Sequence, residues 1–287
     1  MTDEWRTLKV VHSESLNKTI VTLHKLSQYL SWVGSSYIEK ADDFSHTNLG
    51  WDAINSSLIG RWTSDGVRIS FNFQEFSYKL EAPWHYSIIL PEDQTFGEVE
   101  ELLRHLLIAC GLTGSHFQPS DDYQLPYEFD SDEEVERPKS KYLSYWADCR
   151  SNADLMLHKL AAEYAGSSEV RVWPHHFDSG MVIPIEVKND KTLKSIGVGL
   201  SIADGLSNEP YFYLNYFSKN DEKGSLVDLE DSDARTINKK HFKGYILPLS
   251  MIVSYTGSQA QYDITMDFLN RGIDGIMSYS GLTKQMV

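Results

Sequence analysis

The chain has 287 residues, enough for one large domain or two smaller ones, and 41% of them are hydrophobic, which is typical of a folded protein. Its formal net charge of −15 is a poor match for nucleic acid or an anionic membrane surface, because both carry negative charge themselves. We therefore expect a soluble protein that has neither nucleic acid nor a membrane as a partner.

The N-terminal segment is polar and lacks the apolar core of a signal peptide. The longest apolar runs, such as LLIACGL at 106–112, are far shorter than the roughly 18 residues that a membrane-spanning helix needs. Cys110 and Cys149 are the only cysteines, and their helical surroundings predict two buried thiols rather than a disulfide. These features together predict a cytoplasmic protein.

The first half of the chain predicts a helix, four strands and a second helix. The first helix contains LHKL at 23–26 and continues through Tyr29 and Trp32. The strand-like segments are SLIGRWT (57–63), VRISFNF (67–73), SYKLEA (77–82) and HYSIIL (85–90). The alternation in VRISFNF predicts one face made of Val67, Ile69, Phe71 and Phe73.

A capping pattern predicts the start of the next helix, because Thr95 is followed three positions later by Glu98. Gly111 or Gly114 is expected to end this helix. Its apolar face is predicted to consist of Leu102, Leu103, Leu106 and Leu107. His105 lies among these leucines and is expected to be a packing residue rather than a catalyst.

An acidic connector is predicted at 116–138, because this stretch has prolines and no helical or strand periodicity. It also contains several aromatic residues, namely Phe117, Tyr123, Tyr127 and Phe129. Aromatic side chains bury large apolar areas, so part of the connector is expected to pack on the folded surface.

The second half, 139–287, repeats the order of the first half, 1–115. A helix over 139–166 again contains LHKL, at 157–160. The strand-like segments are SEVRVWP (168–174), GMVIPIEV (180–187), KSIGVGLSI (194–202) and PYFYLNYF (210–217). A polar insert at 218–243 precedes YILPLSM (245–251) and a last helix over 261–277.

This shared order predicts a tandem duplication of one helix–four-strand–helix repeat; chance occurrence of the same order is the alternative. Strands joined by short turns favour antiparallel pairing. We therefore predict an α+β fold, in which both repeats build a pseudo-twofold antiparallel sheet with helices packed on one face.

Several local patterns resemble the bacterial family of unknown function called DUF5996. They are TLHKLSQYL, HTNLGWDAINSSLIGRWTSDGVRISFNFQEFSYKL, SYWADCRSNADLMLHKL, VRVWPHHFDSGMVIPIE, GVGLSIADGLSNEPYFYLNYF, YILPLSM and MDFLNRGIDGI. The resemblance covers most of the chain outside the connector and the insert, and it implies a fold without implying an activity. The family pattern has an acidic residue and a histidine around the third strand, where this chain has Asn72 and Phe76.

The segment RVWPHHFDSG, 171–180, is the first candidate site. If the backbone is extended after Pro174, His176 and Asp178 point to one face, and His175 points to the other. An aspartate beside a histidine fixes its tautomer and raises its basicity, which suits a general base or a metal ligand. The alternative interpretation is a turn in which the histidines form local hydrogen bonds.

A zinc or iron site at this place would need a further ligand from elsewhere in the chain. The candidates are His46, His85, Glu186 and Glu209. None of them stands at a diagnostic spacing, and the sequence specifies no cofactor.

The segment EPYFYLNYF, 209–217, is the second candidate site. Alternation places Tyr211 and Tyr213 on one face, where they would line a pocket or form a half-buried sheet face, and Glu209 would reach into such a pocket. The nearby IGVGLSIADG, 196–205, lacks the last glycine of a dinucleotide motif, because Ile202 stands there. Its glycines are instead expected to allow close packing or a bulge in a strand.

Other conspicuous residues have structural interpretations. His24 and His158 each stand beside a lysine on their helices and are expected to be partly exposed. Five tryptophans are expected to be core anchors, namely Trp51, Trp62, Trp84, Trp146 and Trp173.

The leading hypothesis is a small-molecule-binding protein whose cavity is lined by strands of the second half. Its polar lining would consist of His175, His176, Asp178, Glu209, Tyr211 and Tyr213, with His46 as a further ligand-binding candidate. One alternative is a hydrolase that uses His176 and Asp178 as a metal site or general base. The other is a scaffold whose acidic connector and insert bind a basic partner.

Overall fold

The computed structural model describes residues 4–219, 224–230 and 232–282, and they form two compact units with interleaved segments. Unit 1 comprises His12–Ala147 and Arg171–Phe177. Unit 2 comprises the described residues within 4–11, 148–170 and 178–282. The chain therefore passes between the units several times, and the 116–138 segment belongs to unit 1.

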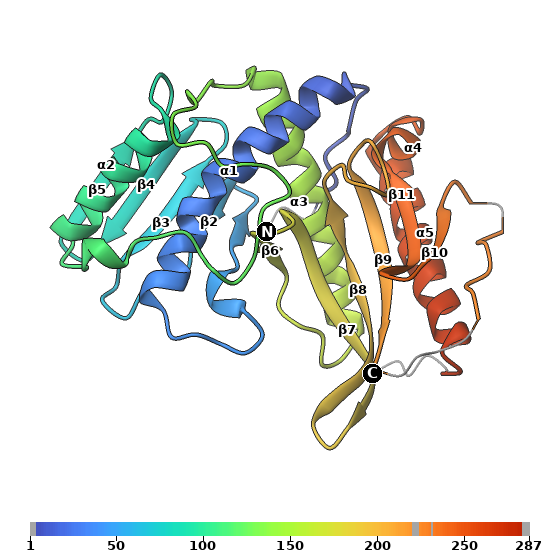
Figure 1. Ribbon diagram of the computed structural model, residues 1–287. Coiled ribbons are helices and arrows are strands. Elements are labelled where there is room, and N and C mark those ends of the chain that lie inside the picture. Colours follow the sequence, from blue (N-terminus) through green and yellow to red (C-terminus); the bar gives the residue numbers. More distant parts are fainter. Residues whose placement is uncertain (1–3, 220–223, 231, 283–287) are drawn as a thin grey trace. The chain divides into compact units, whose positions relative to one another are not determined.

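Unit 1 combines helices with a five-stranded antiparallel sheet, whose order is β1-β2-β3-β4-β5. Its helices are α1 (Ser13–Tyr37), the short 3-10 helix η1 (Ser45–Thr47), α2 (Phe96–Ala109) and the 3-10 helix η2 (Gly114–His116). Its sheet strands are β1 (Gly50–Asp52), β2 (Ser57–Ile59), β3 (Arg68–Asn72), β4 (Ser77–Ala82) and β5 (His85–Ile89). Figure 1 shows α1 and α2 against one face of this sheet.

The core of unit 1 lies between the sheet and these helices. The predicted apolar face of VRISFNF is confirmed, because all four of its residues are buried. Two tyrosine hydroxyls tie α1 into this core: Tyr78 donates to the Leu26 carbonyl at 2.7 Å, and Tyr29 donates to the Phe96 carbonyl at 2.5 Å. Burial of apolar area around the sheet is the main stabilising contribution.

The predicted start of α2 is also confirmed. Thr95 Oγ1 accepts from the Glu98 N–H and Glu98 returns a bond to the Thr95 N–H, which completes the capping box. The predicted leucine face is only partly right, because Leu103 and Leu107 are buried whereas Leu102 is exposed. His105 is exposed and not packed, as its ring bonds the Glu101 carbonyl of its own helix.

The 116–138 segment has almost no regular secondary structure, as expected of a connector, yet it packs firmly on unit 1. Phe117 and Val135 are buried. The ring of Phe129 lies 5.9 Å from that of Tyr29 and 5.3 Å from that of Phe96. The expectation that its aromatic residues pack on the folded surface is thus confirmed.

Unit 2 contains a second antiparallel sheet. Its strands within unit 2 lie in the order β10-β11-β9-β8-β7. They are β7 (Asp178–Lys188), β8 (Lys191–Ser201), β9 (Tyr211–Ser218), β10 (Arg235–Lys239) and β11 (Phe242–Pro248). The helices α4 (Leu249–Val253) and α5 (Ser258–Tyr279) follow, and α3 (Ser140–Glu163) begins in unit 1 and ends in unit 2.

Glycines let α5 approach the sheet closely (Figure 1). A Cβ at Gly272 would lie 2.1 Å from the Leu214 side chain on β9, and one at Gly275 would lie 2.8 Å from the Tyr245 hydroxyl on β11. The sequence RGIDGI therefore presents two gaps into which sheet side chains fit. Larger residues at either position would force the helix and the sheet apart.

The short strand β6 (Arg171–Trp173) belongs to unit 1. Val172 forms an isolated antiparallel bridge to Leu49, with both backbone hydrogen bonds present at 2.8 and 2.9 Å. A segment that is distant in sequence thus pairs with the residue that precedes β1.

The α+β class with antiparallel strands is confirmed. The predicted number of four strands per half is too small, since the described residues of the first half form five strands and those of the second half form six. One missed strand, β10, lies inside the predicted polar insert, where it pairs with β11; residues 220–223 and 231 of that insert lie outside the described residues. The tandem repeat and its pseudo-twofold arrangement stay predictions.

Two further expectations concern the cysteines and membranes. Cys110 and Cys149 are both buried and neither forms a disulfide, as predicted. Over the part of the chain that the structure describes, none of the helices combines the length and apolar composition needed to cross a bilayer.

Candidate functional site

The segment RVWPHHFDSG forms a turn at 174–177 rather than extended backbone. Phe177 has a positive φ of 55°, so the strand alternation that would place His176 and Asp178 on one face does not apply. His176 is exposed, and its ring centroid lies 4.3 Å from that of half-buried His175. The premise of the predicted His176–Asp178 pair is therefore wrong, and the catalytic role itself stays a prediction.

Buried groups of unit 1 hold this turn in place. The Pro174 carbonyl accepts from His24 Nε2 at 2.6 Å and from Gln28 Nε2 at 2.9 Å. The His24 ring also stacks on Phe177, with centroids 4.8 Å apart and an interplanar angle of 5°. His24 is fully buried and not partly exposed as predicted, whereas His158 is partly exposed.

Asp178 lies in unit 2, where it is buried and accepts a 2.5 Å hydrogen bond from the Tyr213 hydroxyl. The buried guanidinium of Arg150 donates to Ser179 Oγ at 2.9 Å. Burial lowers the pKa of Arg150 to about 9, and the charge of Asp178 opposes this effect. Arg150 thus stays charged at neutral pH, and Asp178 supplies part of its charge balance.

Two glycines make the space for Tyr213. Gly199 is its direct partner on β8, and a Cβ there would lie 2.8 Å from the tyrosine ring. A Cβ at Gly180 on β7 would lie 2.8 Å from the Tyr213 hydroxyl. The expectation that the glycine-rich strand allows close packing is confirmed.

The two remaining residues of this candidate site also have partners of their own. The buried Tyr211 donates to Asp204 Oδ2 at 2.8 Å. Glu209 accepts from the backbone N–H and the hydroxyl of Ser250 at 2.8 and 2.7 Å, close to the start of α4. A carboxylate near a helix N-terminus is stabilised by the helix dipole, so Glu209 supports α4.

The proposed extra metal ligands have other partners within their own units. His85 bonds Ser87 within β5, and Glu186 pairs with Lys194 in unit 2. Among residues 4–219, 224–230 and 232–282, no group of three or more His, Cys, Asp or Glu side chains is arranged to hold a metal ion.

The clearest candidate site is a polar groove in unit 1, with a volume of about 520 Å³. It is lined by the end of α1 with Lys40 beyond it, by His46 of η1, and by η2 with the segment that follows it. The lining residues are Ser35, Ser36, Lys40, His46, Ser115, His116, Gln118, Pro119, Ser120, Asp121 and Asp122. Of the predicted site residues, only His46 is in this groove.

In the groove, the carboxylate of Asp122 lies between the side chains of Lys40 and His46. Lys40 Nζ forms a hydrogen-bonded ion pair with Asp122 Oδ1, and His46 Nε2 lies 3.5 Å from Asp122 Oδ2. The hydrogen bond from Lys40 holds the pKa of Asp122 below its ordinary value of 3.8, and the positive charge of Lys40 acts in the same direction. Asp122 is therefore a carboxylate at neutral pH.

The ring of His46 is oriented by its surroundings. Its Nδ1 accepts the Ala41 backbone N–H at 3.3 Å, so the proton of the neutral ring is on Nε2, which faces Asp122. Both ring nitrogens are thus engaged. His46 is suited to fix the carboxylate rather than to take a proton from a substrate.

Local sequence explains why His46 lies where it does. A Cβ on Gly34 of α1 would lie 2.3 Å from the His46 carbonyl oxygen, so only glycine permits this approach. Phe44 enters η1 with a positive φ of 57°, which turns the chain back toward α1.

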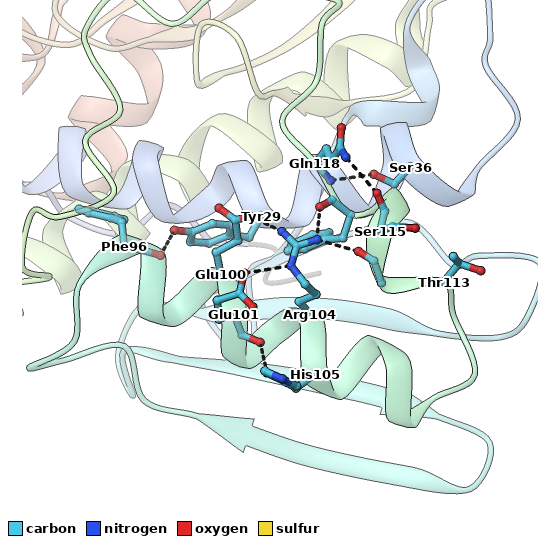
Figure 2. Close-up of polar contacts among 12 residues, drawn as sticks. Tyr29, Ser36, Phe96, Glu100, Glu101, Arg104, His105, Thr113, Ser115 and Gln118 are labelled. Atoms are coloured by element: carbon cyan, nitrogen blue, oxygen red, sulfur yellow. Dashed lines mark hydrogen bonds and ion pairs between the residues drawn. The ribbon is translucent and has the colours of Figure 1, made fainter.

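Arg104 of α2 fixes the part of the groove wall that is formed by η2 and the residues after it. Its Nη1 donates to the carbonyls of Gly114 and Phe117 at 2.6 and 2.7 Å, while Glu101 and Glu100 accept from its other nitrogens (Figure 2). Gln118 is then joined to the wall, because its N–H donates to Ser36 Oγ at 3.4 Å and its side chain donates to the Ser115 carbonyl at 3.0 Å.

Sequence reasoning missed Asp122 and Lys40 as site residues. Asp122 lies in a stretch that reads as an acidic connector, and no local pattern relates it to His46. The contact depends on the folding of that stretch against α1, which single-sequence periodicity does not reveal.

No protein-family model matches this chain. Comparisons with curated proteins and with solved structures also find no match. The resemblance to the DUF5996 family therefore stays a prediction.

Proposed function

We propose that this protein binds a small polar molecule carrying an ammonium group in the groove of unit 1. The observation that carries the proposal is the carboxylate of Asp122, which is fixed by buried His46 but neutralised by an exposed lysine. An ammonium group of a ligand can replace that of Lys40 at a carboxylate that is already oriented.

The rest of the lining suits a hydroxylated ligand. Four serines and Gln118 supply hydrogen-bonding groups around the carboxylate, and Asp121 adds a second negative charge. We prefer binding to catalysis because both nitrogens of His46 are engaged. The ligand class is thus a small amino polyol.

N-methylglucamine and sorbitol form a matched pair of probes, since both are acyclic polyols and only the first has an ammonium group. In an NMR titration of the full chain, N-methylglucamine should shift the amide signals of Ser36, His46 and Asp122, and sorbitol should not. Asp122→Asn should weaken binding by about tenfold or more, because the ion pair is lost.

Two further variants sharpen the test. Lys40→Met should tighten binding of N-methylglucamine, because the internal ammonium no longer competes with that of the probe. Glu128→Gln removes an exposed charge from the same segment outside the groove lining and should leave binding unchanged. Equal shifts with sorbitol, or weaker binding by Lys40→Met, would contradict the proposal.

A further inference from the structure

A second surface of unit 1 has the composition of an interface. The tryptophans at 62 and 84 are exposed rather than core anchors, which corrects the sequence-based expectation, although Trp146 is buried as predicted. The exposed fractions of the residues on and beside β5 are 67% for Trp84, 58% for Tyr86, 55% for Ile88 and 59% for Leu90. Contiguous exposed aromatic and aliphatic residues of this kind mark interaction sites.

These side chains follow the alternation of a strand. Tyr86, Ile88 and Leu90 are separated by two positions, so they project from the same face of the sheet. The intervening Ile89 is buried on the opposite face. The exposed apolar stripe is therefore a property of the whole strand and not of one misplaced residue.

β5 is also an edge strand, because it is last in the order of its sheet. Its outer backbone N–H and C=O groups have no neighbouring strand among the described residues of unit 1. Edge strands are usually protected by charged residues, and HYSII contains no lysine, arginine, aspartate or glutamate. Prolines stand on both sides of it, at positions 83 and 91, and limit the length that can pair.

We propose that β5 pairs antiparallel with β5 of a second copy of this chain, about a two-fold axis at Ser87. This register overlaps all five residues of the strand with their equivalents. It places Tyr86 opposite the partner's Ile88, so the two apolar stripes become continuous.

Charges on β4 select this register over its neighbours. Glu81 is the cross-strand partner of Tyr86, and Lys79 is that of Ile88. With the axis at Ser87, each cross-strand row places Glu81 of one copy and Lys79 of the other on the two sides of the Tyr86–Ile88 pair; within its own chain Glu81 also pairs with Arg68 at 2.8 Å and lies 3.6 Å from Lys79. An axis at Tyr86 or Ile88 would give the central row like charges at both ends. The charges thus favour this register, while the apolar stripe supplies affinity.

Sedimentation velocity of the full chain over about a hundredfold range of concentration tests the proposal. We expect a reversible monomer–dimer equilibrium. Ile88→Glu should raise the dimer dissociation constant by about tenfold or more, because it places a charge in the apolar stripe twice per dimer. This glutamate can pair with Lys79, so the fold is retained, which a thermal unfolding measurement checks.

Ile54→Glu is the matched control, because Ile54 is 70% exposed on a turn outside this surface and its change should leave the equilibrium unaltered. The register is tested by charge exchange. Lys79→Glu alone should weaken the dimer, and Lys79→Glu combined with Glu81→Lys should restore it. A chain that is monomeric at every concentration, or a dimer that Ile88→Glu leaves intact, would overturn the proposal.

Discussion

Asp178 partly balances a buried charge in unit 2, and this defines its expected effect on stability. In Asp178→Ala the Tyr213 hydroxyl loses its acceptor, and the buried Arg150 loses a compensating charge. We expect the free energy of unfolding to fall by about 2–4 kcal/mol, as measured by denaturant titration.

Two variants separate the causes of this effect. Asp178→Asn keeps an acceptor for Tyr213 and removes the charge, so it should retain part of the lost stability. His176→Ala, at an exposed position, should change stability by less than about 0.5 kcal/mol. Similar stability of Asp178→Ala and the unaltered protein would show that the carboxylate does not balance Arg150.

At the scale of the element, the contact between α1 and η1 depends on one glycine. Gly34→Ala places a methyl group 2.3 Å from the His46 carbonyl oxygen, so η1 must move away from α1. We expect a loss of about 1–3 kcal/mol in stability and a changed chemical shift for the His46 ring, measured by NMR. Gly205→Ala is the control, because no atom lies within 4 Å of its added Cβ; an unshifted His46 in Gly34→Ala would contradict the account.

The elements that were predicted correctly are those specified by local pattern. The alternation of VRISFNF and the capping box at Thr95 depend only on residues a few positions apart. The same patterns do not report whether a given face is covered. Hydrophobicity alone therefore predicts core positions for Trp84 and Trp62, although both are exposed.

The candidate site was less predictable because its contacts join distant parts of the chain. Buried His24 forms a hydrogen bond with the carbonyl of Pro174, which is 150 positions away in the sequence. The lysine beside His24 in LHKL does not indicate that this histidine is buried. The bend after Pro174 was foreseen as an alternative. The groove around Asp122 was not, since the connector that forms its wall lacks any periodicity.

At the scale of the whole molecule, each compact unit is built from segments of both halves of the chain. The N-terminal segment belongs to unit 2, where two buried amides bind it as a neighbouring strand would. Asn152 exchanges 2.8 Å hydrogen bonds with the N–H and carbonyl of Arg6, and Gln261 does so with Leu8 at 2.8 and 2.9 Å. A fragment of residues 139–287 would leave both amides without these partners.

The fragment 1–138 has the complementary defect. It lacks Val172, which bridges Leu49, and Pro174, whose carbonyl satisfies His24 and Gln28. Because buried polar groups without partners are costly, we expect neither fragment to show the cooperative thermal unfolding of the full chain by circular dichroism.

A peptide of residues 168–179 supplies the missing strand and turn, so it should bind the 1–138 fragment and raise its melting temperature. The same peptide with Val172→Asp should not, because that valine is buried beside Leu49 and a carboxylate there would be desolvated. If the 1–138 fragment alone melted cooperatively at the temperature of the full chain, the β6 segment would be dispensable to unit 1. Peptide-dependent stabilisation would instead establish that unit 1 is completed by residues from the other half of the sequence.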